Sequence, residues 1–118
     1  MKIKVLRIAD KGVPDLERLH LSVLADANLV NYAVFDTVKL TNGTAIQSIP
    51  KHTYWFLSYP VKAGDDVVLY TRPGVQSKAV RGGGGTTHFF FWGMTHTLWD
   101  APDACAVVLE VVDWATSP

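Results

Sequence analysis

The sequence predicts an all-β protein, built as a sandwich or a small barrel of about seven to nine short strands. Apolar residues alternate with a period of two along most of the chain. The same stretches are rich in Val, Thr, Tyr, Phe and Trp, and turn signals recur at short intervals. A chain of 118 residues is long enough to bury one core. We therefore expect a single domain over residues 1–118.

The strands are expected in order between clear turns. Four consecutive glycines at 82–85 are too flexible for a strand and predict a loop. The Asn-Gly pair within "TNGT" (41–44) predicts a tight hairpin turn, because both residues tolerate positive φ angles. Further turns are expected at Gly64 and at Pro73–Gly74. The clearest strands are expected at residues 2–9, 52–59, 65–72, 88–94 and 104–114.

The segment "PDLERLHLSVLADAN" (14–28) fits two structures. A helix would begin with Asp15 as its N-cap and carry an apolar stripe. A strand would alternate Leu19, Leu21 and Val23 with polar residues. The surrounding strand signals favour the strand, and a short helix near residues 15–27 stays open as the alternative.

The stretch "FFFWGMTHTLWD" (89–100) has the highest density of aromatic residues in the chain. Two packed sheets leave a gap of about 10 Å that large rings fill efficiently. We therefore expect this stretch to serve mainly the core rather than a site.

The composition excludes several classes of protein. Eleven basic and eleven acidic residues give no net charge, so charge alone predicts no attraction to nucleic acid or membranes. Neither a signal-peptide pattern nor an apolar run of eighteen residues is present. The lone Cys105 excludes an intramolecular disulfide and lies in an apolar run, so we expect a buried thiol. The expected location is cytoplasmic, without membrane contact.

No pattern typical of catalysis is present, and we expect neither an enzyme nor a cofactor. The four glycines are not followed by the lysine and hydroxyl residue that a phosphate-binding loop requires. The histidines are too scattered for a zinc signature. A metal-dependent binding protein or small enzyme stays open as the alternative if these residues converge in space: His20, His52, His88 and His96.

The candidate binding residues lie in and beside the segment 72–87. Between residues 67 and 81 there are three basic residues and no acidic one, so a loop here could make charge-assisted contacts with a partner. Nucleic acid is a third possibility for this loop, which the zero net charge makes unfavourable. The candidate residues are Arg72, Lys78, Arg81 and His88.

The order of several motifs resembles lamin tail domains and their bacterial relatives. The motifs are "ERLHL" (17–21), "LVNYAVFD" (29–36), "YPVKAGDDVVLYTRPG" (59–74) and "FFWGMTHTLWDAPDACAVVLE" (90–110). The resemblance implies an immunoglobulin-like β-sandwich and a non-catalytic interaction module for protein, in some members also for nucleic acid. No binding residue is carried over from the family. The resulting hypothesis is a module that binds a protein partner, or a second copy of itself, through the 72–87 loop and exposed sheet edges.

Overall fold

The computed structural model describes residues 1–40 and 46–118 and is all-β over that range. It contains one 3-10 helix, Leu29–Asn31, and more strands than the seven to nine expected. Ala27–Asn28, Pro60–Val61 and Ser77–Val80 were not expected as separate strands, and only Ser77–Val80 lies in a segment that we expected to be a loop. The strands are β1 (Ile3–Ala9), β2 (Arg18–Val23), β3 (Ala27–Asn28), β4 (Tyr32–Val38), β5 (Thr53–Trp55), β6 (Pro60–Val61), β7 (Asp66–Tyr70), β8 (Ser77–Val80), β9 (Thr86–Phe91) and β10 (Ala104–Glu110).

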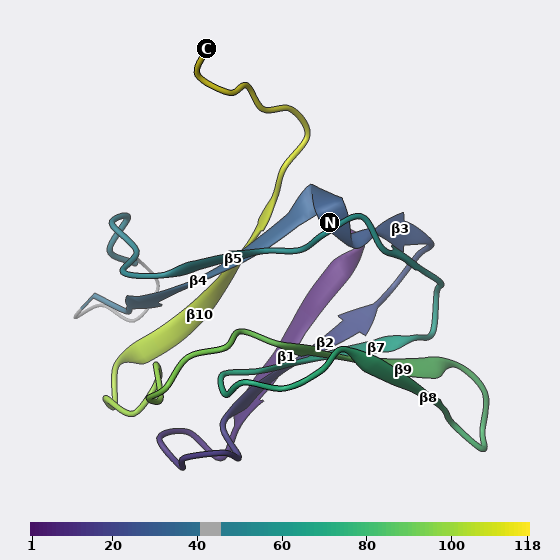
Figure 1. Ribbon diagram of the computed structural model, residues 1–118, viewed down its shortest axis with the longest axis horizontal. Helices are drawn as coiled ribbons and strands as arrows, with labels where there is room; N and C mark the ends of the chain where they lie inside the picture. The colour runs from purple at the N-terminus through teal and green to yellow at the C-terminus, as the bar shows by residue number, and fades with distance from the viewer. Residues whose placement is uncertain (41–45) are drawn as a thin grey trace.

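The largest sheet has five strands in the order β1-β2-β7-β9-β8 (Figure 1). All neighbours are antiparallel except β7 and β9, which are parallel. Consequently β2 begins at the same end of the sheet where β7 and β9 end. β1 is an edge strand of this sheet, and a register shift between Val5 and Arg7 interrupts its pairing with β2.

A second sheet has the order β10-β4-β5, and β3 and β6 form a two-stranded sheet. In Figure 1, β4, β5 and β10 lie towards the upper left and β7, β8 and β9 towards the lower right. After β10 the chain continues without regular structure to a C-terminus that projects beyond the sheets (Figure 1).

The core lies between the two larger sheets. Leu19, Leu21 and Val23 of β2 point into it from one side, and Val34 of β4 from the other. The aromatic stretch contributes Phe90 and Trp99, which are almost fully buried, as expected, and Phe90 meets Phe56 edge to face. The Trp99 indole nitrogen donates to the Cys105 carbonyl at 3.1 Å, which joins this stretch to β10.

The segment 14–28 contains a strand and no α-helix, so the favoured interpretation is confirmed. Asp15 has a φ of 65°, whereas a helix N-cap requires an extended backbone. Pairing of β2 with strands on both sides satisfies its backbone groups and buries its alternate apolar residues.

Three further expectations concern Cys105, the turn at 41–44 and the 72–87 loop. Cys105 is buried, as predicted, and this burial raises the pKa of its thiol. The hairpin turn predicted at 41–44 lies outside the described residues. The loop expected between residues 72 and 87 is only partly a loop, because residues 77–80 pair with β9 and form β8.

Candidate functional site

The four candidate binding residues lie in or near the β8–β9 hairpin, but they do not form one site. Lys78 and His88 are direct partners across the ladder of the hairpin. Arg81 lies at its turn, beside Asp66 at the start of β7. Arg72 lies at the opposite end of β7, next to Tyr70. The expected convergence of the three cations on one surface loop is therefore not what the structure shows.

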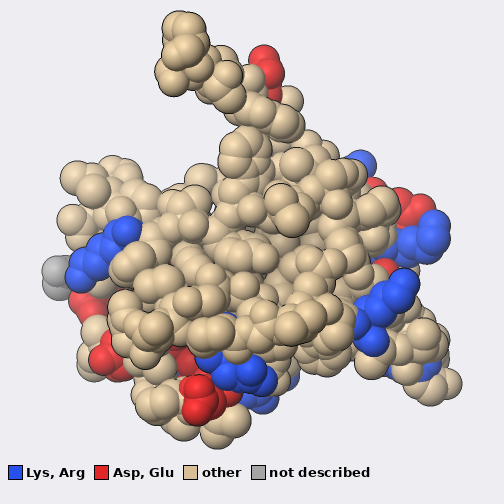
Figure 2. Space-filling view, viewed as in Figure 1, with Lys and Arg blue, Asp and Glu red and all other residues tan. Residues whose placement is uncertain are grey.

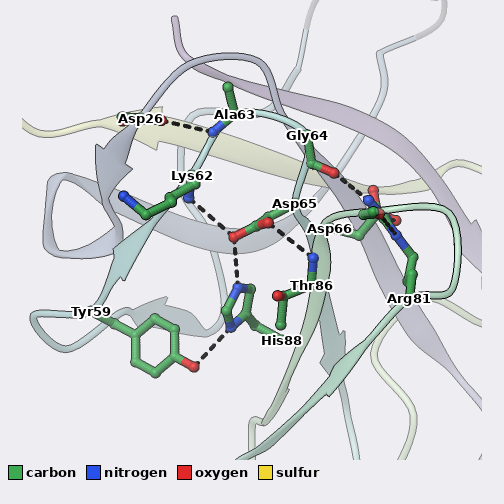
Figure 3. A network of polar contacts seen from close by, with 11 residues as sticks. Asp26, Tyr59, Lys62, Ala63, Gly64, Asp65, Asp66, Arg81, Thr86 and His88 are labelled. Carbon is green, nitrogen blue, oxygen red and sulfur yellow. Dashed lines mark hydrogen bonds and ion pairs between the residues drawn. The ribbon is translucent and has the colours of Figure 1, made fainter.

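His88 is buried in a polar network at the base of the hairpin (Figure 3). Its Nε2 lies 2.9 Å from Asp65 Oδ2, and its Nδ1 lies 2.8 Å from the Tyr59 hydroxyl. The amides of Lys62 and Thr86 also donate to the Asp65 carboxylate. An ionised carboxylate only accepts hydrogen bonds, so His88 Nε2 carries a hydrogen. His88 thus fastens β9 to the turn before β7 and is not presented to a partner.

Asp65 is the centre of this network. Desolvation by burial raises the pKa of its carboxyl group, but the donors of His88, Lys62 and Thr86 outweigh that effect. The net result is a pKa below the ordinary value of 3.8. The charged form of Asp65 is therefore the form that the fold stabilises.

Arg81 fastens the turn of the same hairpin (Figure 3). Its guanidinium pairs with the Asp66 carboxylate and donates to the Gly64 carbonyl. The turn brings Gly85 so close to Gly64 that a Cβ at Gly85 would lie 2.6 Å from the Gly64 oxygen. Gly85 also has a φ of 81°, so glycine is required there for two reasons. Arg81 is thus already engaged within the protein.

Arg72 is held on an aromatic platform. Tyr70 and Phe91 stack with an interplanar angle of 13°, and the Arg72 guanidinium carbon lies 4.8 Å and 5.0 Å from their ring centroids. Its Nε donates to the Asp15 carbonyl at 3.0 Å. The position of the guanidinium is therefore fixed before any ligand arrives.

The outer side of β8 is the part of the hairpin that remains open. β8 is the last strand of its sheet, and no described strand pairs with its outer side. All four of its residues are exposed, and Val75 and Val80 expose 85% and 82% of their surface. Within the described chain, the Lys78 side chain has no ion-pair partner.

The charges on the surface do not form one basic patch on the face shown in Figure 2. Lys and Arg side chains lie in small groups near the margin of that face, and the middle carries no charged side chain. With Arg72 and Arg81 engaged internally, a positive surface loop of three cations is not formed.

The four histidines do not converge on one place, although two of them are neighbours. His52 and His96 are neighbours, with ring centroids 6.0 Å apart, and His52 Nδ1 lies 3.1 Å from Asp36 Oδ2. His88 points to the core, whereas His20 lies on the opposite face of the same sheet, since it alternates with the buried Leu19 and Leu21. Among the described residues, no three His, Cys, Asp or Glu side chains are placed to hold a metal ion.

A cleft of about 500 Å³ opens at the end of the five-stranded sheet where β7 and β9 end. Its walls come from residues 14–17, 71–73 and 94–97. The sequence analysis missed this cleft, because its walls come from segments far apart in the chain. The only available signals were Arg72, singled out for its charge, and His96, considered as a metal ligand.

Glu17 forms the buried floor of the cleft and was also missed as a structural centre. Only 1% of its surface is exposed. One carboxylate oxygen accepts hydrogen bonds from the Thr71 hydroxyl and the Leu98 amide. The other accepts from the amides of Gly12 and Trp99. The four donors fill the acceptor positions of the carboxylate.

Comparison of the chain with protein-family models, with curated proteins and with solved structures found no match. None of the helices in the described residues is long and apolar enough to cross a membrane.

Proposed function

We propose that the protein is a non-catalytic binding module that recognises an extended segment of a partner protein along the free edge of β8. The observation that carries this proposal is that every residue of β8 is exposed and that no described strand pairs with its outer side. A strand at a sheet edge presents backbone donors and acceptors in a row, and an extended peptide can add to it as a further strand.

The anchoring of the hairpin supports this function. Arg81 holds the turn onto the 64–66 segment, and the Asp65–His88 pair holds β9 from inside. The edge is therefore ordered before binding, which reduces the conformational entropy lost when a partner docks. Strand addition needs such an edge, because a mobile loop would have to be ordered first.

The side chains beside the edge indicate the chemistry of the partner. Val75 and Val80 offer exposed apolar contacts, and Lys78 offers a positive charge between them. A partner segment with β-branched or aromatic residues and an acidic side chain is complementary to this edge.

A second copy of the chain is one such partner, since two β8 edges could pair with each other. Light scattering on a size-exclusion column across a range of concentrations tests this form of the proposal. A dimer that is lost in Val80→Asp supports pairing through β8, and a monomer at every concentration excludes it.

We also propose that the sandwich is immunoglobulin-like and related to lamin tail domains. The support comes from Glu17, which belongs to "ERLHL" and accepts hydrogen bonds from Leu98 and Trp99 of the "FFWGMTHTLWD" stretch. Two of the motifs that resemble the family are thus in direct contact.

The test of the binding function is a selection of peptides on the purified protein, followed by amide hydrogen exchange. Peptides selected from a random library should slow exchange at residues 77–80, and Val80→Asp should abolish their binding. Val112→Asp is the matched control, because Val112 is 85% exposed and lies beyond β10 of the other sheet. Selected peptides that leave exchange at residues 77–80 unchanged, or that still bind Val80→Asp, would overturn the proposal.

A further inference from the structure

The cleft at the end of the five-stranded sheet has the size of a small-molecule site. Its volume of about 500 Å³ lies within the range of roughly 300–1,000 Å³ that is usual for such sites. It is separate from the outer edge of β8, since its walls come from the ends of β2, β7 and β9. Its apolar lining includes Pro14, Pro73 and Met94.

Arg72 gives the cleft one positive wall with free hydrogen-bond donors. A guanidinium has five N–H groups. Nε donates to the Asp15 carbonyl and one Nη1 hydrogen to the Pro73 carbonyl. The Nη2 group has no partner among the described residues. Tyr70 and Phe91 hold the guanidinium plane in place, so its free N–H donors are positioned to bind a carboxylate.

Asp15, next to Arg72, and the buried Glu17 also line the cleft and carry negative charge, but only one of them is available to a ligand. The four acceptor positions of Glu17 are already filled from within the protein. Asp15 is exposed, and no described residue donates to its side chain. The cleft therefore offers one free positive group and one free negative group.

We propose that this cleft binds a small zwitterion, an amino acid or a short peptide with free termini. The carboxylate binds Arg72, the ammonium group binds Asp15, and an apolar side chain packs against Pro73 and Met94. A ligand with only a negative charge would be repelled by Asp15, and one with only a positive charge by Arg72. A zwitterion satisfies both charges.

The test is an NMR titration of the full chain with leucine, leucyl-leucine, and the N-acetyl and C-terminal amide forms of leucyl-leucine. Leucyl-leucine or leucine should shift the backbone amides of Thr71 and residues 94–97. Removing either terminal charge should weaken binding about tenfold, as expected for one charge-assisted hydrogen-bonded pair. Comparing leucine with leucyl-leucine then decides between a free amino acid and a peptide.

Two variants assign the charges. Arg72→Gln should weaken the binding of leucyl-leucine about tenfold and leave the binding of its C-terminal amide unchanged. Asp15→Asn should also weaken the binding of leucyl-leucine about tenfold, and it should leave the binding of the N-acetyl form unchanged. Lys78→Gln and Asp26→Asn are the matched controls and should bind as the natural chain does. If Arg72→Gln fails to fold, the comparison of the charged and blocked ligands on the natural chain still shows whether both terminal charges contribute to binding.

No shift at these amides with millimolar leucine or leucyl-leucine would overturn the proposal. Equal binding of the blocked and unblocked ligands would overturn it as well. The outcome is independent of the peptide-binding edge, because Val80→Asp leaves the cleft intact and should not change the titration.

Discussion

At the scale of single residues, two buried carboxylates organise the molecule. Glu17 joins the loop before β2 to the segment after β9, and Asp65 joins the turn before β7 to β9. Each charge is buried, and each is surrounded by donors that compensate for the loss of water. Neither residue carries a sequence pattern that marks it as buried, because Asp and Glu are usually exposed.

Glu17→Gln is expected to destabilise the protein strongly. The amide can accept at only one of its two heavy atoms, so its NH₂ group would face two backbone or hydroxyl donors. Leaving buried donors without an acceptor costs about 1–3 kcal/mol for each donor. Urea denaturation measures the loss, and Glu110→Gln at the exposed end of β10 is the control, with little change expected. A loss for Glu17→Gln no larger than that of the control would contradict the assigned role.

The stability of the protein should depend on the charge of Asp65 at low pH. Because the folded-state pKa lies below 3.8, the ionised group stabilises the fold above the unfolded pKa, and this contribution is lost as the pH falls through the folded pKa. Asp65→Asn should therefore be less stable at neutral pH by about 1–3 kcal/mol, and the gap to the natural chain should narrow below about pH 4.

The measurement for Asp65 is a series of denaturation curves from pH 7 to pH 2. Asp26→Asn serves as control, since Asp26 is exposed and accepts a single hydrogen bond, from the Ala63 amide. A gap that stays constant with pH would show that the charge of Asp65 is not what stabilises the fold.

At the scale of elements, the β8–β9 hairpin combines an exposed strand with a firmly held base. Its turn is attached through Arg81, and its inner strand is attached through His88. The glycines of the turn allow the chain to pass close to Gly64, which is what brings Arg81 to Asp66. The loop predicted at residues 82–85 is therefore a turn that specific contacts hold in place.

Arg81→Met is expected to loosen the hairpin without unfolding the protein. Amide exchange at residues 77–80 should become faster, whereas exchange in β2, in the middle of the same sheet, should stay the same. Lys78→Met is the matched control, because it removes a cation from the same hairpin that has no ion-pair partner among the described residues. Equal exchange in both variants would argue against anchoring through Arg81.

At the scale of the whole molecule, the two larger sheets share one core. Phe90 of the five-stranded sheet meets Phe56 beside β5, and Tyr54 of β5 lies near Trp92 after β9. Neither sheet has a separate apolar interior, since one cluster of buried residues contains side chains from both. Both sheets are therefore expected to lose their structure together.

Thermal unfolding should thus be a single cooperative transition. Tryptophan fluorescence, to which the buried Trp99 and its neighbour Trp92 contribute, and far-ultraviolet circular dichroism, which reports the strands, should give the same midpoint. A fluorescence transition well before the loss of strand signal would mean that the sheets separate first.

The sequence by itself determined the class of fold and the nature of most strands. Alternation of apolar residues identified β2 in an ambiguous segment, and the aromatic stretch was recognised as core, because side-chain periodicity and burial are local properties of the chain. The tertiary structure alone decided which charged side chains make contacts within the protein and which one lines a cleft. Arg81 and His88 bond to Asp66 and Asp65 within the protein, and Arg72 lines a cleft beside Asp15. These partners lie 15 to 57 residues away in sequence. Long-range strand pairing brings these groups together, and no local pattern carries that information.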